Sequence, residues 1–176
     1  MRKFIITAGL IAGLFLGINN FAYSSDMERL QIISEIGTLA NSEKYDEALA
    51  KCNTALKKYP NEAELYYWSG AIKSHQGESK SAIDDFDTAI RLNPKESSIY
   101  VMRGMTKSDI EDDKGALEDY NHALKINPKD SSAYSMRACV KLKMGDLKGA
   151  NDDLNIANEL YDEQEQNNIK EGEHKE

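Results

Sequence analysis

Residues 97–130 read SSIYVMRGMTKSDIEDDKGALEDYNHALKINPKD, and the same pattern occurs again on both sides of this stretch. The next copy, at residues 131–164, reads SSAYSMRACVKLKMGDLKGANDDLNIANELYDEQ, and the preceding copy, at residues 63–96, reads AELYYWSGAIKSHQGESKSAIDDFDTAIRLNPKE. A looser copy occupies residues 29–62, and the prolines Pro60, Pro94 and Pro128 follow one another at a constant interval. Self-similarity at a fixed period of this length is typical of a solenoid, in which small structural units stack on one another.

Each repeat contains two segments with helical periodicity. The first segment of the repeat at residues 97–130 has two neighbouring stripes: Tyr100, Gly104 and Lys107 on one, and Val101, Met105 and Ser108 on the other. A second apolar face follows the acidic residues 111–113 and consists of Ala116, Tyr120, Ala123, Leu124 and Ile126. Asn127 and Pro128 end it, because proline cannot continue a helix. The sequence therefore predicts a helix, a short turn and a second helix in each repeat.

Small residues recur where the two helices of a repeat should touch. The first helices carry Gly70, Gly104 and Ala138 at one shared place, and the second helices carry Ala82, Ala116 and Ala150 at another and Ala89, Ala123 and Ala157 at a third. Between these alanines stands a bulky side chain: Phe86, Tyr120 or Leu154. Small residues let helix axes approach to about 8 Å, and the bulky side chain fills the groove beside them.

This pattern resembles the tetratricopeptide repeat (TPR) family: a helix–turn–helix unit with a period of 34, a small residue in the first helix, Ala-x3-aromatic-x2-Ala in the second, and then proline. The resemblance covers residues 29–162. The first repeat fits less closely, because Ile36 stands where the small residue belongs, and the last repeat lacks the closing proline. The resemblance implies an all-α fold, a right-handed α-solenoid of stacked helix–turn–helix units, and a protein that binds another protein or a peptide.

The predicted domain organisation has three parts: a signal peptide at residues 1–24, a TPR domain at residues 25–162, and a charged tail at residues 163–176 that is disordered beyond about residue 166. The four repeats lie at about residues 29–62, 63–96, 97–130 and 131–162. A solenoid needs a polar outer face on its last helix, and the residues that can supply it are Asn151, Asp152, Asn155, Asn158 and Glu159.

The N-terminal segment has the features of a secretory signal peptide. Met1-Arg2-Lys3 is a basic head, an apolar run extends from Phe4 to Ile18, and cleavage is expected after Ala22 or Ser24. The run is shorter than the ~20 residues that a membrane span needs. A retained membrane anchor is the alternative, because small residues four positions apart are typical of packed membrane helices and recur here as Gly9, Gly13 and Gly17. In either case the chain is expected to be exported, to the periplasm or as a secreted protein.

The charge balance limits the class of partner. The chain has a net charge of −8, and removal of residues 1–24 takes away Arg2 and Lys3, which changes the net charge to −10. Nucleic acid and anionic membrane surfaces need a basic patch, so neither is an expected partner. Membrane contact is expected only if the N-terminal segment is retained, and no small-molecule substrate is expected.

Charged residues also recur at the period of the repeat. The first helices carry a basic row, made by Arg103, Arg137, Lys73, Lys107 and Lys141. The second helices carry an acidic row, made by Asp84-Asp85, Glu118-Asp119 and Asp152-Asp153. We expect ion pairs that set the register between the two helices, and the alternative is a charged recognition strip. Exposed pairs of this kind are each worth about 0–1 kcal/mol.

The sequence contains no motif for catalysis or for a cofactor. The histidines (His75, His122 and His174) lie far apart, and no His or Cys has metal-ligand spacing. Glycine-rich phosphate loops and nucleophile motifs are missing. We therefore expect a protein that is not an enzyme and that has no cofactor. We expect Cys52 and Cys139 to stay unpaired, because four predicted helices lie between the helices that carry them.

The first helices of TPR domains line the concave surface, and here one of their stripes is nearly free of charge in a chain that is 30% charged. The predicted binding residues on this stripe are Tyr67, Ala71, Val101, Met105, Ser135 and Cys139, with Trp68 at the groove wall. Chaperone-binding TPR domains hold a peptide carboxylate with Lys and Asn at such places, where this chain has Tyr67, Val101 and Ser135. We therefore expect an extended segment or helix with apolar anchors rather than an acidic tail. Packing between neighbouring repeats is the alternative for Val101 and Met105.

Overall fold

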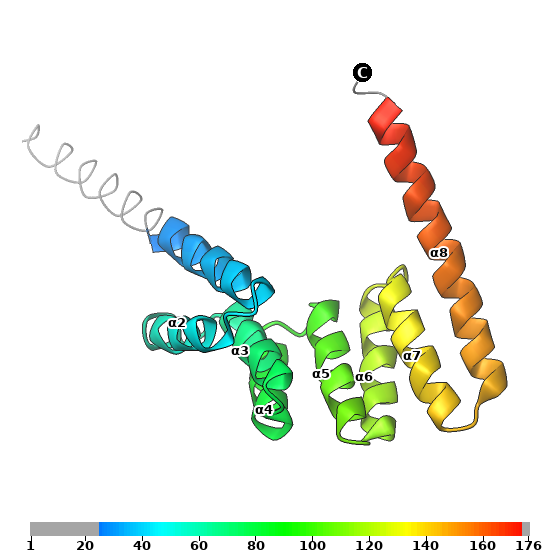
Figure 1. Cartoon of the computed structure of the whole chain (residues 1–176), viewed down its shortest axis with the longest axis horizontal. Coiled ribbons are helices and arrows are strands. Elements are labelled where there is room, and N and C mark those ends of the chain that lie inside the picture. Colours follow the sequence, from blue (N-terminus) through cyan, green and yellow to red (C-terminus); the bar gives the residue numbers. More distant parts are fainter. Residues whose placement is uncertain (1–24, 174–176) are drawn as a thin grey trace, which may run out of the picture. The chain divides into compact units, whose positions relative to one another are not determined.

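The computed structural model of the protein describes residues 25–173, and every regular element in that range is an α-helix (Figure 1). The first helix covers residues 25–41. The helices that follow it are α2 (Tyr45–Lys58), α3 (Ala63–His75), α4 (Ser79–Leu92), α5 (Ser97–Asp109), α6 (Asp113–Ile126), α7 (Ser131–Lys143) and α8 (Leu147–Glu173). The predicted turns and prolines therefore fall between the helices.

The described chain divides into two compact bodies, and the division comes after Pro60. In the first body, the helix over residues 25–41 and α2 bury a small core of Ile33, Ile36, Ala48, Cys52 and Ala55. In the second body, each helix from α3 to α8 packs against the next, and α5 also contacts both α3 and α7. The predicted fold class, an α-solenoid of helix–turn–helix units, is confirmed.

The turn inside each repeat has the same backbone conformation in all four repeats. Glu43, Gly77, Glu111 and Gly145 occupy the same place in successive repeats and have φ angles of 60°, 80°, 65° and 83°. The residue after each of them donates its backbone N–H to a carbonyl five residues back, as Asp112 does to Lys107 at 2.9 Å. This is the Schellman arrangement, in which one left-handed residue closes the helix end. Glycine adopts that conformation without strain, whereas for glutamate it costs about 1–2 kcal/mol.

The helices approach one another closely at the small residues. A Cβ atom added to Gly70 would lie 2.9 Å from Phe86 Cε1, and one added to Gly104 would lie 2.9 Å from Tyr120 Cε1. Both rings are fully buried, and so are the alanines on either side of them in α4 and α6. The rings therefore fill the space that the small residues leave, as the sequence predicts.

The last helix continues beyond the predicted start of the charged tail. Residue 162 lies inside α8, and the segment expected to be disordered beyond about residue 166 is helical as far as Glu173. The physical reason is local, because no proline or glycine interrupts the chain between Gly149 and Gly172.

The outer side of α8 is polar where the corresponding side of α6 is apolar. Leu117 and Leu124 of α6 pack in the clusters shared with α7. In the next repeat, their places are taken by Asn151 and Asn158, and both asparagines are exposed. Polar residues thus cover the end of the stack.

Residues 1–24, which carry the predicted signal peptide or anchor, lie outside the described residues. From residue 25 to residue 173, no helix combines the length and the hydropathy that crossing a bilayer requires.

Candidate functional site

The first helices of the second, third and fourth repeats form one continuous row. These helices are α3, α5 and α7, and α5 contacts both of its neighbours. The predicted binding residues occupy two shared places on them: Tyr67, Val101 and Ser135 at one, and Ala71, Met105 and Cys139 at the other. We call this set of residues the groove row.

Side chains at the centre of the groove row are half-buried. Val101 and Met105 pack against the cluster of Ala116, Tyr120 and Val140, which joins the third repeat to the fourth. Both residues thus take part in the packing named as the alternative to ligand binding, and each still presents part of its side chain to solvent. The groove row consequently offers apolar surface at its centre.

The fourth repeat contributes more polar and more exposed side chains. Ser135 is half-buried, and its Oγ donates a hydrogen bond to the carbonyl oxygen of Ser131 at 3.0 Å. Cys139 is exposed and is not part of a disulfide. Leu142, one turn further along α7, is 46% exposed. It lies seven positions after Ser135 on the same stripe, so the i, i+4, i+7 spacing predicts it, although it is absent from the residues named from the sequence.

Ala71 is not available to a ligand, which corrects its assignment to the groove row. Its exposed fraction is only 7%, and it packs in a core cluster with Ala82, Phe86, Ala89 and Ile99. The reason is its short side chain: a methyl group here stays below the surface that larger neighbours such as Tyr67 form above the core.

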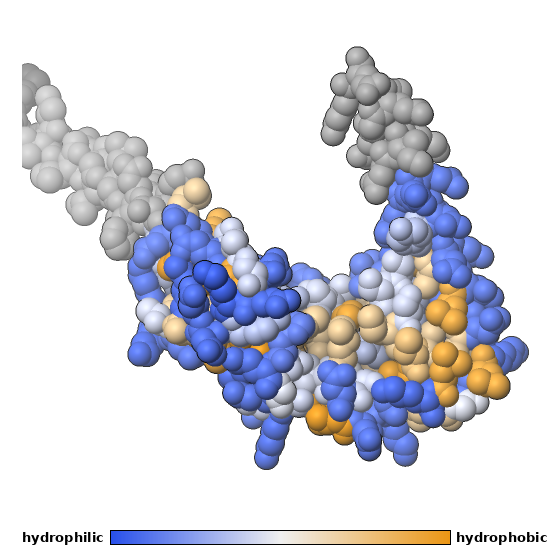
Figure 2. All heavy atoms as spheres, viewed as in Figure 1, coloured by the Kyte–Doolittle hydropathy of each residue, from blue (hydrophilic) through white to orange (hydrophobic). Residues whose placement is uncertain are grey.

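The second repeat contributes aromatic surface. The rings of Tyr67 and Trp68 meet edge to face, with centroids 5.5 Å apart and an interplanar angle of 73°. Tyr67 also lies 6.3 Å from the ring of Phe86, which anchors it against the core. Trp68 is half-buried, and its Nε1 is a buried donor with no acceptor among the described residues. Figure 2 shows hydrophobic and weakly polar surface over the helices of the second body, between strongly hydrophilic areas.

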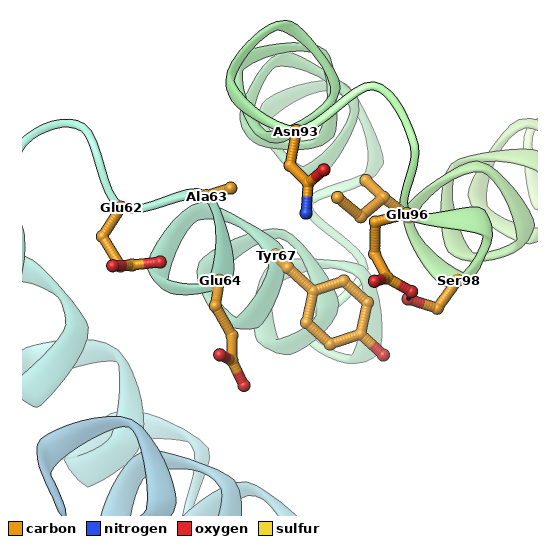
Figure 3. Close-up of a pocket in the computed structure, with 8 residues that line it drawn as sticks. Glu62, Ala63, Glu64, Tyr67, Asn93, Glu96 and Ser98 are labelled. Carbon is orange, nitrogen blue, oxygen red and sulfur yellow. Dashed lines mark hydrogen bonds between the residues drawn. The ribbon is translucent and has the colours of Figure 1, made fainter. Parts of the chain in front are cut away.

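A cavity of about 340 Å³ opens beside Tyr67 at the beginning of α3 and α5 (Figure 3). Its polar lining consists of Glu62, Glu64, Tyr67, Asn93, Glu96 and Ser98. Burial raises the pKa of the Tyr67 hydroxyl, and the nearby carboxylates of Glu96 and Glu64 raise it further. Tyr67 thus belongs both to the groove row and to an acidic cavity at its edge.

Buried ion pairs hold the helices that carry the groove row. Asp119 binds Arg103 and Lys107, and Asp153 binds Arg137 and Lys141, as the recurring charges predict. From the sequence, these ion pairs are expected to be exposed. In the structure they are buried on the acidic side, because Asp119 and Asp153 are only 1% and 2% exposed. Burial, the largest effect, favours the protonated form of Asp153, but the hydrogen bonds from its two cations outweigh burial and hold its pKa below the usual range.

These cations also link successive repeats. Arg103 of α5 reaches back to Asp87 of α4, and Arg137 of α7 reaches back to Asn121 of α6. In the first body, the pair within the repeat has its charges exchanged, since Glu35 stands at the place of Arg103 and Lys51 at the place of Asp119. The pairs therefore specify how each helix sits against its neighbours.

Among the side chains that the structure describes, those of residues 25–167, no group of three His, Cys, Asp or Glu is arranged to hold a metal ion.

The repeated helix pairs, the constant period and the row of partly exposed side chains define a helical-repeat protein of the α-solenoid class. Two family models of the tetratricopeptide repeat match the chain, one at residues 63–96 and 97–130 and the other at residues 119–150. Together the matches span residues 63–150, which is half of the 176 residues. The chain belongs to the tetratricopeptide repeat family.

Several solved structures share this fold. The crystal structure of MamA has a TM-score of 0.72 at 19% identity, and the match covers 91% of this chain and 94% of that chain. YrrB, described as a TPR protein with an unusual peptide-binding site, has a TM-score of 0.63 at 24% identity, over 73% of this chain and 66% of that chain. The first TPR of Spaghetti (RPAP3), bound to the HSP90 peptide SRMEEVD, has a TM-score of 0.63 at 19% identity, over 66% of this chain and 93% of that chain.

A curated relative matches over a shorter range. The probable biofilm formation methyltransferase WspC of Pseudomonas putida is 29% identical to this chain over 56 residues. The match covers 32% of this chain and 13% of WspC, so this chain corresponds to a small part of that protein's length.

Proposed function

We propose that the protein is an exported TPR module that binds a peptide or a segment of another protein along the groove row. The observation that carries this proposal is the partly exposed apolar surface of Val101, Met105 and Leu142 on helices that lie side by side. Half-buried side chains anchored on a rigid core lose little conformational freedom on binding. The peptide site described for YrrB and the peptide bound by the Spaghetti repeat support the same use of this fold.

The ligand is an extended segment or a helix with apolar anchors. Tyr67, Val101 and Ser135 carry no positive charge, and the cations nearest to them in sequence on α5 and α7 are already bound to Asp119 and Asp153. A ligand that depends on its carboxylates would therefore find no free cation at these places. Binding rather than catalysis is the role that this arrangement supports.

The binding proposal predicts that Met105→Glu weakens peptide binding by about tenfold or more, because a charge replaces a side chain whose burial is worth about 1.5 kcal/mol or more. Dodecapeptides selected from a display library on the wild-type protein serve as the probe, and fluorescence anisotropy measures their affinity. Cys139→Glu changes an exposed position and tests the same surface without disturbing the core, and Tyr67→Ala tests the other end. Ile126→Glu, at an exposed position on α6, is the matched control. Unchanged affinity in the folded groove variants would contradict the proposal.

Export is the second part of the proposal, and it rests on residues 1–24. We expect the mature chain to begin near Tyr23 or Ser25, because the basic head and the short apolar run precede the small residues there. The intact mass of the exported product measures this directly. A chain that keeps Met1 and stays in the membrane fraction would instead favour a membrane-anchored scaffolding or assembly subunit.

A further inference from the structure

We infer that the segment bound on the groove row carries a lysine or arginine, whose cationic group enters the acidic cavity beside Tyr67. This inference rests on the proposed function and specifies the partner of the same site. The partner is a peptide segment that combines apolar anchors with one basic side chain.

The cavity brings together carboxylates from two repeats. Glu64 lies in the first turn of α3, and Glu96 directly precedes α5. In Figure 3 the ring of Tyr67 lies between the two carboxylates. None of the residues that line the cavity is a lysine, arginine or histidine. A cation placed here would thus lie in a cavity whose charged lining residues are all acidic.

The Glu96 carboxylate does not cap the helix that follows it. Glu96 is the N-cap residue of α5, but its side chain accepts no hydrogen bond from the helix backbone. One repeat later, Asp130 does cap α7, since it accepts a hydrogen bond from the backbone N–H of Ala133 at 2.9 Å. Glu96 instead accepts a hydrogen bond from Ser98 Oγ at 2.9 Å, which orients its carboxylate at the cavity.

The carboxylates of the cavity differ from the aspartates that pair the helices of each repeat. Asp85, Asp119 and Asp153 are each bound by a cation of the chain. Within the described residues, neither Glu64 nor Glu96 is bound by such a cation. Burial is the main cause of the raised pKa of Tyr67, and the charges of Glu96 and Glu64 add to it. No basic side chain therefore lines the cavity, and a ligand can supply the complementary charge.

The cavity and the apolar surface are close enough for one short segment. Tyr67 and Val101 lie on neighbouring first helices, and packed helices are about 8–10 Å apart. An extended peptide covers that distance with about three residues, at roughly 3.3 Å per residue. We therefore expect the basic residue to stand about three positions from the apolar residue that contacts Val101 or Met105.

The test uses the dodecapeptides selected on the wild-type protein. Their sequences should be enriched in lysine or arginine about three positions from Leu, Met or Phe. Replacing the basic residue of a selected peptide by glutamine should weaken binding by about fivefold, the size expected for a partly exposed ion pair. In the double variant Glu64→Gln/Glu96→Gln, the two peptides should bind equally well.

The control is a second double variant, Glu118→Gln/Asp152→Asn, which removes the same charge from exposed positions on α6 and α8. It should keep the preference for the basic peptide. An equal loss of preference in both double variants would mean general attraction by an acidic protein and would overturn the inference. Selected peptides that are apolar but not basic would also overturn it and leave the proposed function standing. If no peptide can be selected on the wild-type protein, both this inference and the proposed peptide-binding function are contradicted.

Discussion

Asp119→Ala is expected to lower the free energy of unfolding by about 3 kcal/mol, because it leaves two cations without their carboxylate in a buried site. Asp119 is 1% exposed, and the Arg103 and Lys107 side chains that bind it are each 17% exposed. The value lies at the lower end of the usual cost of breaking a buried pair, since Arg103 keeps its contact with Asp87. Urea unfolding followed by circular dichroism measures the change.

The adjacent residue provides the matched control for this prediction. Glu118 is exposed, so Glu118→Ala should change the free energy of unfolding by less than about 0.5 kcal/mol. If both variants unfolded at the same urea concentration with the same slope, the ion pairs behind the groove row would be unimportant for stability. A smaller loss for Asp119→Ala in an Arg103→Met background would show that the cost arises from the unpaired cation.

Ala116→Phe should destabilise the second body by about 1–3 kcal/mol through overpacking. Ala116 is completely buried and lies in the cluster with Tyr120 and Val140, so the larger ring has no space that is not already filled. Lys114→Ala, at an exposed position on the same helix, is the control and should change the melting temperature little. Equal melting temperatures for the two variants would contradict the packing of α6 against its neighbours.

The architecture of the repeats follows from the sequence with little ambiguity. Prolines at a constant interval mark the ends of the second helices in the first three repeats. Proline has no backbone N–H to donate, and its ring clashes with the preceding helical turn. Gly104 and Ala116 predict the close contact of the two helices, because only small side chains permit it, and the structure confirms that contact through Tyr120. These are local constraints, and local constraints can be recognised in a linear pattern.

The backbone conformation of Glu111 and the burial of Ala71 depend instead on the tertiary packing around each residue. Glu111 adopts the left-handed conformation that Gly77 and Gly145 adopt, although its side chain disfavours it, because the Schellman turn between two packed helices requires it. Ala71 belongs to the predicted stripe, but its methyl group is covered by the packing of the second repeat. No periodic pattern encodes either outcome.

The sequence by itself determined the repeat, the helix pairs, their contact residues and the basic and acidic rows that face each other. Only the tertiary structure decided that Asp119 and Asp153 are buried, that Ala71 is inaccessible, and that Glu96 faces a cavity while Asp130 caps its helix. The physical reason is that residue spacing defines which side of a helix a side chain occupies. Burial, charge pairing and cavities arise only when helices from neighbouring repeats are brought together.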